Sequence, residues 1–464
     1  MTIMDTTRDS SRRAFLKRSA ALGLAGVATP FVTSLAAIGE AAAATATDYK
    51  ALVCVFLYGG MDYANTLAAY DADSYAKYLA ARSNIALTRE SLSSTLLNPA
   101  TGLANGRQYA LAPTMGSLLP LFDAGKLAVA LNVGTLVQPT TKAQYQANSV
   151  KLPPKLFSHN DQQSYFQASN PEGATSGWGG RMGDLFQSGN GAATLTCINA
   201  SGNAVYLTGK SAVQYAIGTG GPIALLNNAT SLYGSTAAAA TLRSLMTGSS
   251  GNLFADEHAR VSKRALDTYS QVTSALAGAP ASGFSLFPGN NGLADQLKMV
   301  ARLIAVSSQL GAKRQVFFVS IGGFDLHDNL VAQHPGLMGK VADAMRAFYD
   351  TTVALGVADQ VTSFTASDFG RTLQSNDDGS DHGWGSHHFV LGGAVKGRRF
   401  YGTPPAIGNN TADDVGQGRL LPTISVDQYA ATLANWFGVS SGNMTTVLPN
   451  MGNYNASSWN LGFV

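Results

Sequence analysis

ALVCVFLYGGMDYAN, residues 51–65, opens with seven apolar residues in a row and then turns at two glycines. A short continuous apolar run that stops at glycine is typical of a central strand covered on both faces, because a strand with one face in water alternates apolar and polar residues. The stretch therefore predicts a buried strand over 51–57, a sharp turn at Gly59 and Gly60, and polar residues such as Asp62 just beyond the strand.

Similar apolar runs recur along the chain, with helical patterns between or beside them. Strands that alternate with helices predict an α/β fold with a mainly parallel central sheet flanked by helices. Residues 169–251 are rich in Gly, Ala, Ser and Thr, and we interpret them as strands and loops that elaborate one domain spanning 45–464. The expected strands are 51–57, 127–133, 315–320, 361–365 and 388–391, and the expected helices are 293–310, 337–355 and 426–436.

The first 44 residues have the three parts of a secretory signal: a basic start, an apolar middle and small residues at the end. The adjacent Arg12 and Arg13 indicate export by the twin-arginine translocase, with cleavage near Ala44. An uncleaved membrane anchor is the alternative, but glycines and Pro30 break the apolar run, and no later stretch is apolar enough to span a membrane. We expect a periplasmic or otherwise exported protein whose mature chain does not insert stably into the membrane.

The charge balance argues against nucleic acid as a partner. The chain holds 31 Lys and Arg against 28 Asp and Glu, and removal of residues 1–44 leaves 26 against 25. A nearly neutral chain lacks the basic footprint of a nucleic-acid-binding domain. The two cysteines, Cys54 and Cys197, lie in apolar runs without metal-site spacing, so we expect buried free thiols.

Residues that bind metals follow several of the predicted strands. In open α/β sheets, ligands bind beyond the carboxyl ends of the strands. Asp325 and His327, two apart in an extended segment, should point to the same side. Together with the loops below they predict a site for a divalent metal, with Zn, Ca, Mg and Mn all open. The further candidates are Asp368, Asp381 and His382, and another histidine, His159, lies in the segment 158–161.

Several of these residues also have ordinary structural interpretations. An isolated Asp after a strand, such as Asp62, is usually a helix cap or turn residue. His387 and His388 are adjacent in a strand and face opposite ways, so each alone is more typical of a structural histidine. Asp377 and Asp378 are expected in a turn. His258 and His334, on helical stretches, are interpreted as surface or packing residues.

The chain resembles the bacterial domain-of-unknown-function family 1501, whose members are typically exported by the twin-arginine route and are similar to the alkaline phosphatase and sulfatase superfamily. The resemblance implies an alkaline-phosphatase/sulfatase-like fold over nearly all of the mature chain. It also implies metal-binding roles for Asp62, for Asp325 with His327, for Asp368 and for His382. The resemblance rests on the segments Val55–Asp62, Asn132–Pro139, Phe157–Asp161, Phe317–His327, Ser367–Arg371 and Asp381–Gly385.

The chain departs from the superfamily pattern at two places. Phe369 stands where the Asp-His pair has its histidine, which weakens a two-metal site. Val137 stands where sulfatases have a cysteine or serine before Pro139, so the nucleophile is unassigned. Hydroxyls near a metal can attack phosphorus or sulfur, and Arg371 could neutralise anionic oxygens. The candidate nucleophiles are Thr140, Thr141 and Ser158.

Two functional hypotheses therefore stand side by side. The first is an exported metal-dependent hydrolase of a small phosphate or sulfate ester. The second is a non-catalytic periplasmic binding or assembly protein on the same fold with a degenerate site, because a fold does not establish a function.

Overall fold

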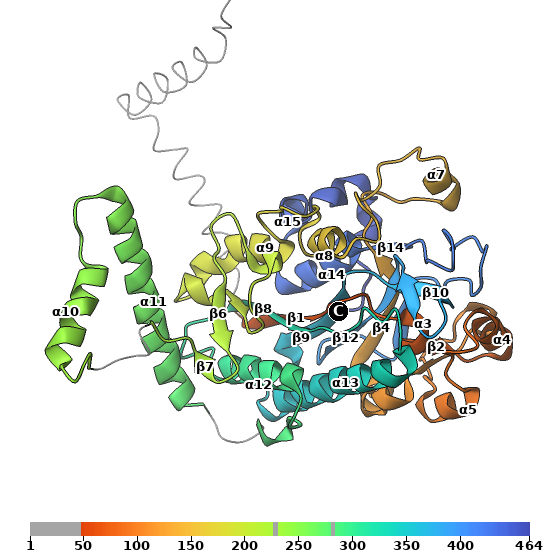
Figure 1. Ribbon diagram of the computed structural model, residues 1–464, viewed down its shortest axis with the longest axis horizontal. Helices are drawn as coiled ribbons and strands as arrows, with labels where there is room; N and C mark the ends of the chain where they lie inside the picture. The colour runs from red at the N-terminus through yellow and green to blue at the C-terminus, as the bar shows by residue number, and fades with distance from the viewer. Residues whose placement is uncertain (1–47, 226–230, 280–283) are drawn as a thin grey trace, which may run out of the picture.

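The computed structural model describes residues 48–225, 231–279 and 284–464 (Figure 1). The proposed signal, residues 1–44, lies outside these ranges. Within them, no helix combines the length and the apolar character needed to cross a membrane.

A ten-stranded sheet forms the centre of the molecule, and β1 lies near its middle. β1 pairs in parallel with β8 on one side and with β9 on the other, so that Leu57 is level with Ile321 and with Ser367. The order across the sheet is β13 (Arg399–Tyr401), β4 (Leu127–Gly134), β12 (Ser386–Gly392), β9 (Val361–Ser367), β1 (Lys50–Leu57), β8 (Arg314–Ile321), β5 (Cys197–Asn199), β6 (Tyr215–Gly218) and β7 (Gly221–Pro222), and β14 (Ile424–Ser425) pairs with β4.

The mainly parallel sheet is confirmed, and β12 is the exception that matters for the site. β12 runs antiparallel to both of its neighbours, β9 and β4. Its amino end therefore lies at the edge of the sheet where β1, β8 and β9 have their carboxyl ends. Residues that precede β12 consequently meet residues that follow the parallel strands.

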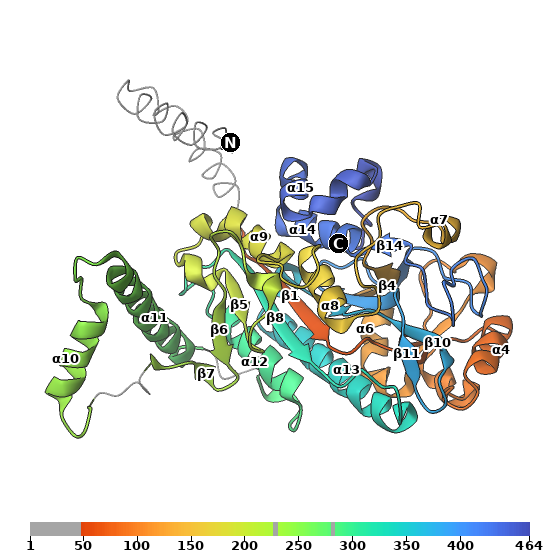
Figure 2. The ribbon, with the colours of Figure 1, turned by 45° about the horizontal axis from the view of Figure 1, so that its top comes forward.

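The alternation of side chains along β1 fills two separate hydrophobic cores. Val53, Val55 and Leu57 belong to the core that includes α12 (Gly292–Ala305) and α13 (Leu330–Ala354). Leu52, Cys54 and Phe56 belong to the core on the other face, with α9 (Trp178–Phe186) and α14 (Val426–Phe437). Helices thus cover both faces of the sheet, as Figures 1 and 2 show, and this explains why the run is apolar throughout. Cys54 and Cys197 are buried free thiols, as predicted.

The expected helix ends shift at two places. α13 begins at Leu330 rather than at 337 and contains Pro335, which a sequence pattern treats as a boundary. Burial of Leu330 and His334 holds this first part of the helix in place. α12 ends at Ala305 rather than at 310. Leu310 is buried, as the apolar pattern suggests, but it lies in a turn that follows the helix.

Residues 169–251 contain helices as well as the expected strands and loops. β5, β6 and β7 extend the sheet beyond β8, while α9 packs through its glycines: a Cβ on Gly180 would lie 2.1 Å from the Thr208 carbonyl carbon. Packing thus overrides the low helix propensity of glycine. α10 (Thr236–Thr247) and α11 (Leu253–Ala277) form a pair that projects from the body of the molecule (Figures 1 and 2).

The remaining longer elements connect or flank this framework. Two small antiparallel sheets are formed by β2 with β3 and by β10 with β11. These elements are α3 (Tyr63–Thr66), β2 (Leu67–Ala69), α4 (Ala72–Ala81), α5 (Arg89–Leu92), β3 (Tyr109–Leu111), α6 (Leu119–Asp123), α7 (Lys142–Gln146), α8 (His159–Ala168), β10 (Arg371–Ser375), β11 (Ser380–His382) and α15 (Met444–Val447).

Candidate metal centre

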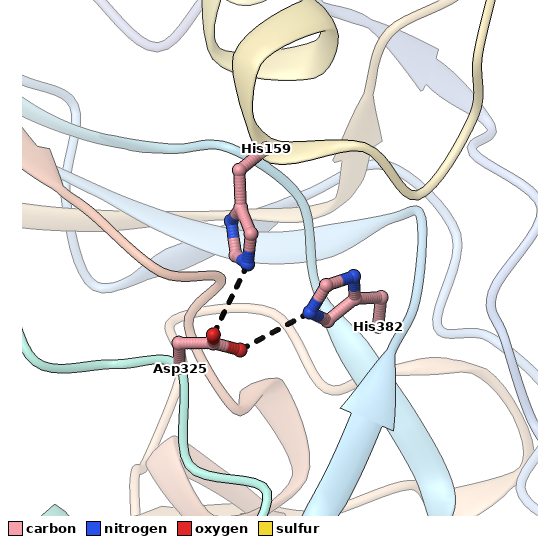
Figure 3. Close-up of side chains that lie close together, drawn as sticks. All are labelled: His159, Asp325 and His382. Atoms are coloured by element: carbon pink, nitrogen blue, oxygen red, sulfur yellow. Dashed lines mark hydrogen bonds and ion pairs between the residues drawn. The ribbon is translucent and has the colours of Figure 1, made fainter.

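Four side chains meet beyond the carboxyl edge of the sheet, and we call them the histidine–aspartate cluster: His159, Asp325, His327 and His382. Asp325 and His327 lie in the loop after β8, His382 ends β11, and His159 is the first residue of α8. In Figure 3, the rings of His159 and His382 point at the Asp325 carboxylate from two sides. The cluster therefore joins three segments that are distant in the chain.

The three histidines present their Nε2 atoms to the same carboxylate. His159 Nε2 lies 3.3 Å from Asp325 Oδ2. His327 Nε2 and His382 Nε2 both lie 3.1 Å from Asp325 Oδ1, and these two nitrogens are 2.9 Å from each other. Possible ligand atoms of His159, Asp325 and His382 all lie within 4.8 Å of one another. This is the spacing of a group that can hold one metal ion.

Each imidazole is anchored through its other nitrogen, Nδ1. His382 Nδ1 is 2.7 Å from the Phe157 carbonyl oxygen, which can only accept, so this nitrogen carries the proton. His159 Nδ1 is 2.6 Å from Asp368 Oδ2, and His327 Nδ1 is 3.2 Å from Asp381 Oδ1. A histidine that donates Nδ1–H to a carbonyl or carboxylate leaves the Nε2 lone pair free for a metal. Asp368 and Asp381 thus lie behind the histidines, as their anchors.

The turn at Gly59 brings β1 and β8 together at the site. Gly59 has φ +116°, and a Cβ there would lie 2.3 Å from the Asp325 backbone nitrogen, so the close approach requires glycine. The Gly59 N–H also donates to Asp368 Oδ2 at 3.2 Å. Phe369 packs beside the rings of His159 and His382, at centroid distances of 4.8 and 4.7 Å. The phenylalanine that departs from the superfamily pattern therefore supports two histidines of the cluster.

The segment before α8 carries backbone strain next to the site. Phe157 has φ +72°, a left-handed conformation that is rare for an aromatic residue. Its carbonyl accepts from His382, and the Arg419 guanidinium lies over its ring at 5.1 Å. Arg419 Nε also donates to the His382 backbone carbonyl at 2.8 Å. Phe157 and Arg419 together fix the orientation of His382, and strained residues held in this way cluster at functional sites.

The electrostatic environment shifts the pKa values of the two aspartates at the site in opposite directions. Burial raises the pKa of Asp368, despite its hydrogen bond with His159. Burial also acts to raise the pKa of Asp325, but the hydrogen bond and charge of Arg371 hold that pKa below its usual value. The hydrogen bond with Asp368 raises the pKa of His159, whereas burial lowers the pKa of His382. The lowered pKa of His382 favours its neutral form, which is the form that binds a metal.

Arg371, expected to neutralise substrate oxygens, lies buried beneath Asp325. Its Nη1 donates to Asp325 Oδ1 at 2.7 Å and to the Gly59 carbonyl at 3.2 Å, while Nε faces Ser380 Oγ at 3.4 Å and Nη2 donates to the Ser380 carbonyl. Because these donors are committed within the protein, Arg371 positions Asp325 and does not offer a free fork to an anion.

Asp62 lies outside the cluster, against the metal-binding role that the resemblance implies. Both of its oxygens accept from Arg82, at 2.7 and 2.8 Å, and the pair is buried. Oδ1 also caps α3 by accepting from the Asn65 N–H at 2.9 Å, which is the helix-cap alternative. Oδ2 accepts from Ser380 Oγ at 3.1 Å. Because both of its oxygens accept these hydrogen bonds, Asp62 has a structural role.

The candidate nucleophiles do not reach the cluster. Thr140 Oγ1 donates to the Gln138 carbonyl, and Thr141 caps α7. Both threonines line a separate cavity of about 880 Å³, none of whose lining residues belongs to the cluster. Ser158 precedes His159, but its hydroxyl donates to Asp161 Oδ2 at 2.9 Å.

Three further histidines behave as structural residues. His387 Nδ1 accepts from the Asn132 N–H at 3.1 Å, and His388 Nδ1 is 3.2 Å from Thr365 Oγ1. Both rings are buried on opposite faces of β12, as the strand geometry predicts. His334 is also buried, beside Thr66 Oγ1 at 3.2 Å.

The structure thus gathers five of the expected residues at one place and adds a sixth. Asp325, His327, Asp368, Asp381 and His382 come together, and His159 joins them although it was not among the expected ligands. Its only signal in the sequence is a histidine in the polar segment 158–161, because it lies at a helix start rather than at a strand end.

Comparison with known proteins identifies a family and little else. No curated protein matches the chain. Among solved structures, a crystal structure of Ps i-CgsB in complex with k-i-k-neocarrahexaose superposes with a TM-score of 0.36 and 9% sequence identity, over 89% of this chain and 78% of the other. At that level of similarity, the alkaline-phosphatase/sulfatase-like architecture stays a prediction. The sequence profile described as "Protein of unknown function (DUF1501)" matches residues 49–445, so the chain belongs to this family.

Proposed function

We propose that this protein is a divalent-metal-dependent hydrolase of phosphate or sulfate esters and that the histidine–aspartate cluster holds its metal. One observation carries the proposal: three Nε2 atoms converge on the Asp325 carboxylate while each Nδ1 is anchored behind its ring. Anchoring of this kind costs conformational freedom, and its benefit is a set of lone pairs aimed at one point.

The unpaired atoms of the cluster support a cation. With Nδ1 of His327 facing Asp381 and Nδ1–H of His382 donated to the Phe157 carbonyl, the two rings turn their Nε2 atoms toward each other at 2.9 Å. His159 Nε2 is buried and makes no hydrogen bond with the described residues. Ligand atoms around a tetrahedral zinc ion are roughly 3.3 Å apart, given bonds of about 2.0–2.1 Å. Four separations in the cluster, from 2.9 to 3.3 Å, are close to that, which supports a cation among these atoms.

The donor set favours one class of metal. Three imidazole nitrogens and one carboxylate suit zinc or a similar transition metal, whereas Ca²⁺ and Mg²⁺ prefer sites made of oxygen. Such an ion, when bound, would polarise an ester oxygen and acidify a water molecule. His159, Asp325 and His382 would hold it. His327, whose side chain is 44% exposed, would be a further ligand on the solvent side.

The start of α8 supports an anionic substrate. α8 begins at His159, and Ser158 makes no side-chain capping bond to its first N–H groups. Free N–H groups and the positive end of the helix dipole favour an anion at this place. A phosphate or sulfate group bound there would lie beside the cluster, and Arg371 beneath Asp325 would keep the carboxylate in position.

The deciding experiment is elemental analysis of the purified protein, followed by turnover assays with aryl phosphates, aryl sulfates and phosphodiesters. We expect about one equivalent of zinc or manganese, lost in Asp325→Ala and His382→Ala and retained in His327→Ala with lower turnover. His258→Ala, on the exposed side of α11, is the control. Absence of metal before and after reconstitution would overturn the metal centre. Bound metal without turnover on any ester would make the chain a non-catalytic binding protein.

A further inference from the structure

A cavity of about 300 Å³ lies between α12 and the turn that joins β6 to β7, the outermost strands on that side of the sheet (Figure 1). A Cβ on Gly220 would meet no atom within 4 Å, so the turn borders open space. No residue of the histidine–aspartate cluster lines this cavity, which is a separate hollow. Its lining consists of Thr219, Gly220, Asp295, Lys298, Met299 and Arg302.

Two cations in this cavity have no partner in the protein. Lys298 and Arg302 lie four residues apart, and therefore on the same side of α12. Both are half-buried, and neither side chain makes an ion pair or a hydrogen bond with any residue in 48–225, 231–279 or 284–464. The half-buried side chains of Lys142 and Arg346, in contrast, both have protein acceptors. Because like charges at this spacing destabilise a helix, an anion between Lys298 and Arg302 would be stabilising.

The mature chain does not supply that anion itself. Asp295 lines the same cavity, but it is exposed and forms no ion pair with Lys298 or Arg302. The residues outside the described ranges contribute acidic side chains only from the proposed signal, namely Asp5, Asp9 and Glu40. The counter-charge of the two cations in the exported protein is therefore an anion from solution.

The turn between β6 and β7 adds neutral donors to the lining. Gly218 pairs with Gly221 across the hairpin, so Thr219 and Gly220 form the turn itself. The N–H groups of Thr219 and Gly220, and the Thr219 hydroxyl, donate to no other residue in the described part of the chain. Successive backbone N–H groups in a turn can form a concavity that binds anions. The cavity thus combines two charged donors with three neutral ones.

This set of donors favours a phosphate group. Arg302 offers a planar fork of N–H groups that matches two phosphate oxygens, and Lys298 adds a compact charge. A phosphate group presents three strong acceptor oxygens, which suit a guanidinium, an ammonium and a turn better than the two oxygens of a carboxylate. The lining has two positive charges and the negative charge of Asp295. Its net charge of one therefore suits a single phosphate better than a polyphosphate.

We propose that α12 and the β6–β7 turn form a binding site for one phosphate group, which is either free inorganic phosphate or the phosphate of a small ester. Lys298 and Arg302 provide the charge, and the turn provides further hydrogen bonds. The site shares no residue with the histidine–aspartate cluster and requires no metal. It therefore goes beyond the proposed hydrolase and does not depend on it.

Equilibrium dialysis with radiolabelled inorganic phosphate tests the site, with EDTA present to remove metal from the cluster and at low ionic strength to limit screening. We expect one phosphate to bind per chain. Lys298→Ala/Arg302→Ala should weaken binding ~10-fold or more, because it removes two charge-assisted contacts. Asp295→Asn should tighten binding, since it removes a like charge. Lys151→Ala/Lys210→Ala loses the same charge at exposed positions and should bind as the wild type does.

Competition with phenylphosphonate, a stable analogue of a phosphate ester, distinguishes the two sources of the ligand. Stronger competition than by unlabelled phosphate would identify an ester as the ligand, and weaker competition would identify free phosphate. The site would be overturned by absence of phosphate binding, by wild-type affinity in Lys298→Ala/Arg302→Ala or by equal loss in the two double variants. These results leave the hydrolase untouched, because its failure appears in metal content and turnover.

Discussion

The Nε2 atoms of His327 and His382 lie 2.9 Å apart, although the two histidines are 55 residues apart in the chain. Both rings are anchored at Nδ1, so neither can turn away without losing a hydrogen bond. A cation bound to both nitrogens would use this convergence of two ring nitrogens on one point. The folded state should therefore bind metal far better than the unfolded chain does.

Removal of metal should lower the melting temperature. A ligand at a hundred times its Kd stabilises the folded state by about 2.7 kcal/mol, and EDTA would remove that contribution. Calorimetry before and after EDTA, and again after added zinc, measures it. His382→Ala should melt at the same temperature with and without EDTA. Equal melting temperatures for the wild type in the two conditions would contradict a metal centre.

Substitutions at Phe157 should separate the role of its backbone from that of its ring. Glycine adopts φ +72° without strain, so Phe157→Gly should keep the carbonyl on His382 and retain metal affinity within a few-fold. Valine is β-branched and resists that conformation. Phe157→Val should weaken metal binding ~10–100-fold, the usual cost of losing such an anchor. Competition with a chromophoric chelator measures the affinity, and Leu156→Val is the control. Wild-type affinity in Phe157→Val would rule out the anchoring role.

The Asp62–Arg82 pair should be important for stability. Arg82→Ala leaves Asp62 buried and unpaired, which costs about 3–5 kcal/mol in the free energy of unfolding. Asp62→Ala/Arg82→Ala should cost less than the two single changes added together. The exposed pair Lys77–Asp73 is the matched control, and Lys77→Ala should cost less than ~1 kcal/mol. Urea denaturation distinguishes these outcomes. A small loss in the free energy of unfolding for Arg82→Ala would mean that water reaches Asp62.

Acid should destabilise the fold through its buried histidines. Burial lowers the pKa of His387 and of His388 to about 3, from an ordinary 6.5. In the unfolded chain these histidines protonate first, so their stabilisation is complete above pH 6.5 and is lost as the pH falls toward 3. Between pH 7.5 and 5 each contributes a loss on the order of 2 kcal/mol.

Urea denaturation in EDTA at several pH values measures this dependence. His388→Gln should flatten it, whereas His258→Gln, at an exposed position, should leave it unchanged. The same slope in His388→Gln as in the wild type would show that His388 does not cause the loss.

Export should depend on the two adjacent arginines. The translocase recognises this pair of arginines in the signal. Arg12→Lys/Arg13→Lys should therefore leave the precursor in the cytoplasm of a bacterium that has the pathway. Cell fractionation with immunoblotting shows where the chain accumulates, and Arg8→Lys serves as the control. Normal export of the double variant would contradict the proposed route.

The sequence predicted the sheet well because the strands are buried on both faces and are therefore apolar throughout. The runs at 51–57 and 315–320 needed no knowledge of their partners. The antiparallel direction of β12 could not be predicted in this way, since it depends on which edge of the sheet the preceding loop reaches. The same holds for His159, which reaches the site from a helix start, and for Asp62, whose partner Arg82 has no distinctive sequence pattern.

The direction of β12 also has a consequence for when the site matures. His382 lies four residues before β12, which pairs with both β9 and β4, two strands from distant parts of the chain. A chain still emerging from the ribosome would have His159 but would not yet have made His382. Metal uptake at the proposed centre would thus be a late event, which requires synthesis of at least the first 382 residues.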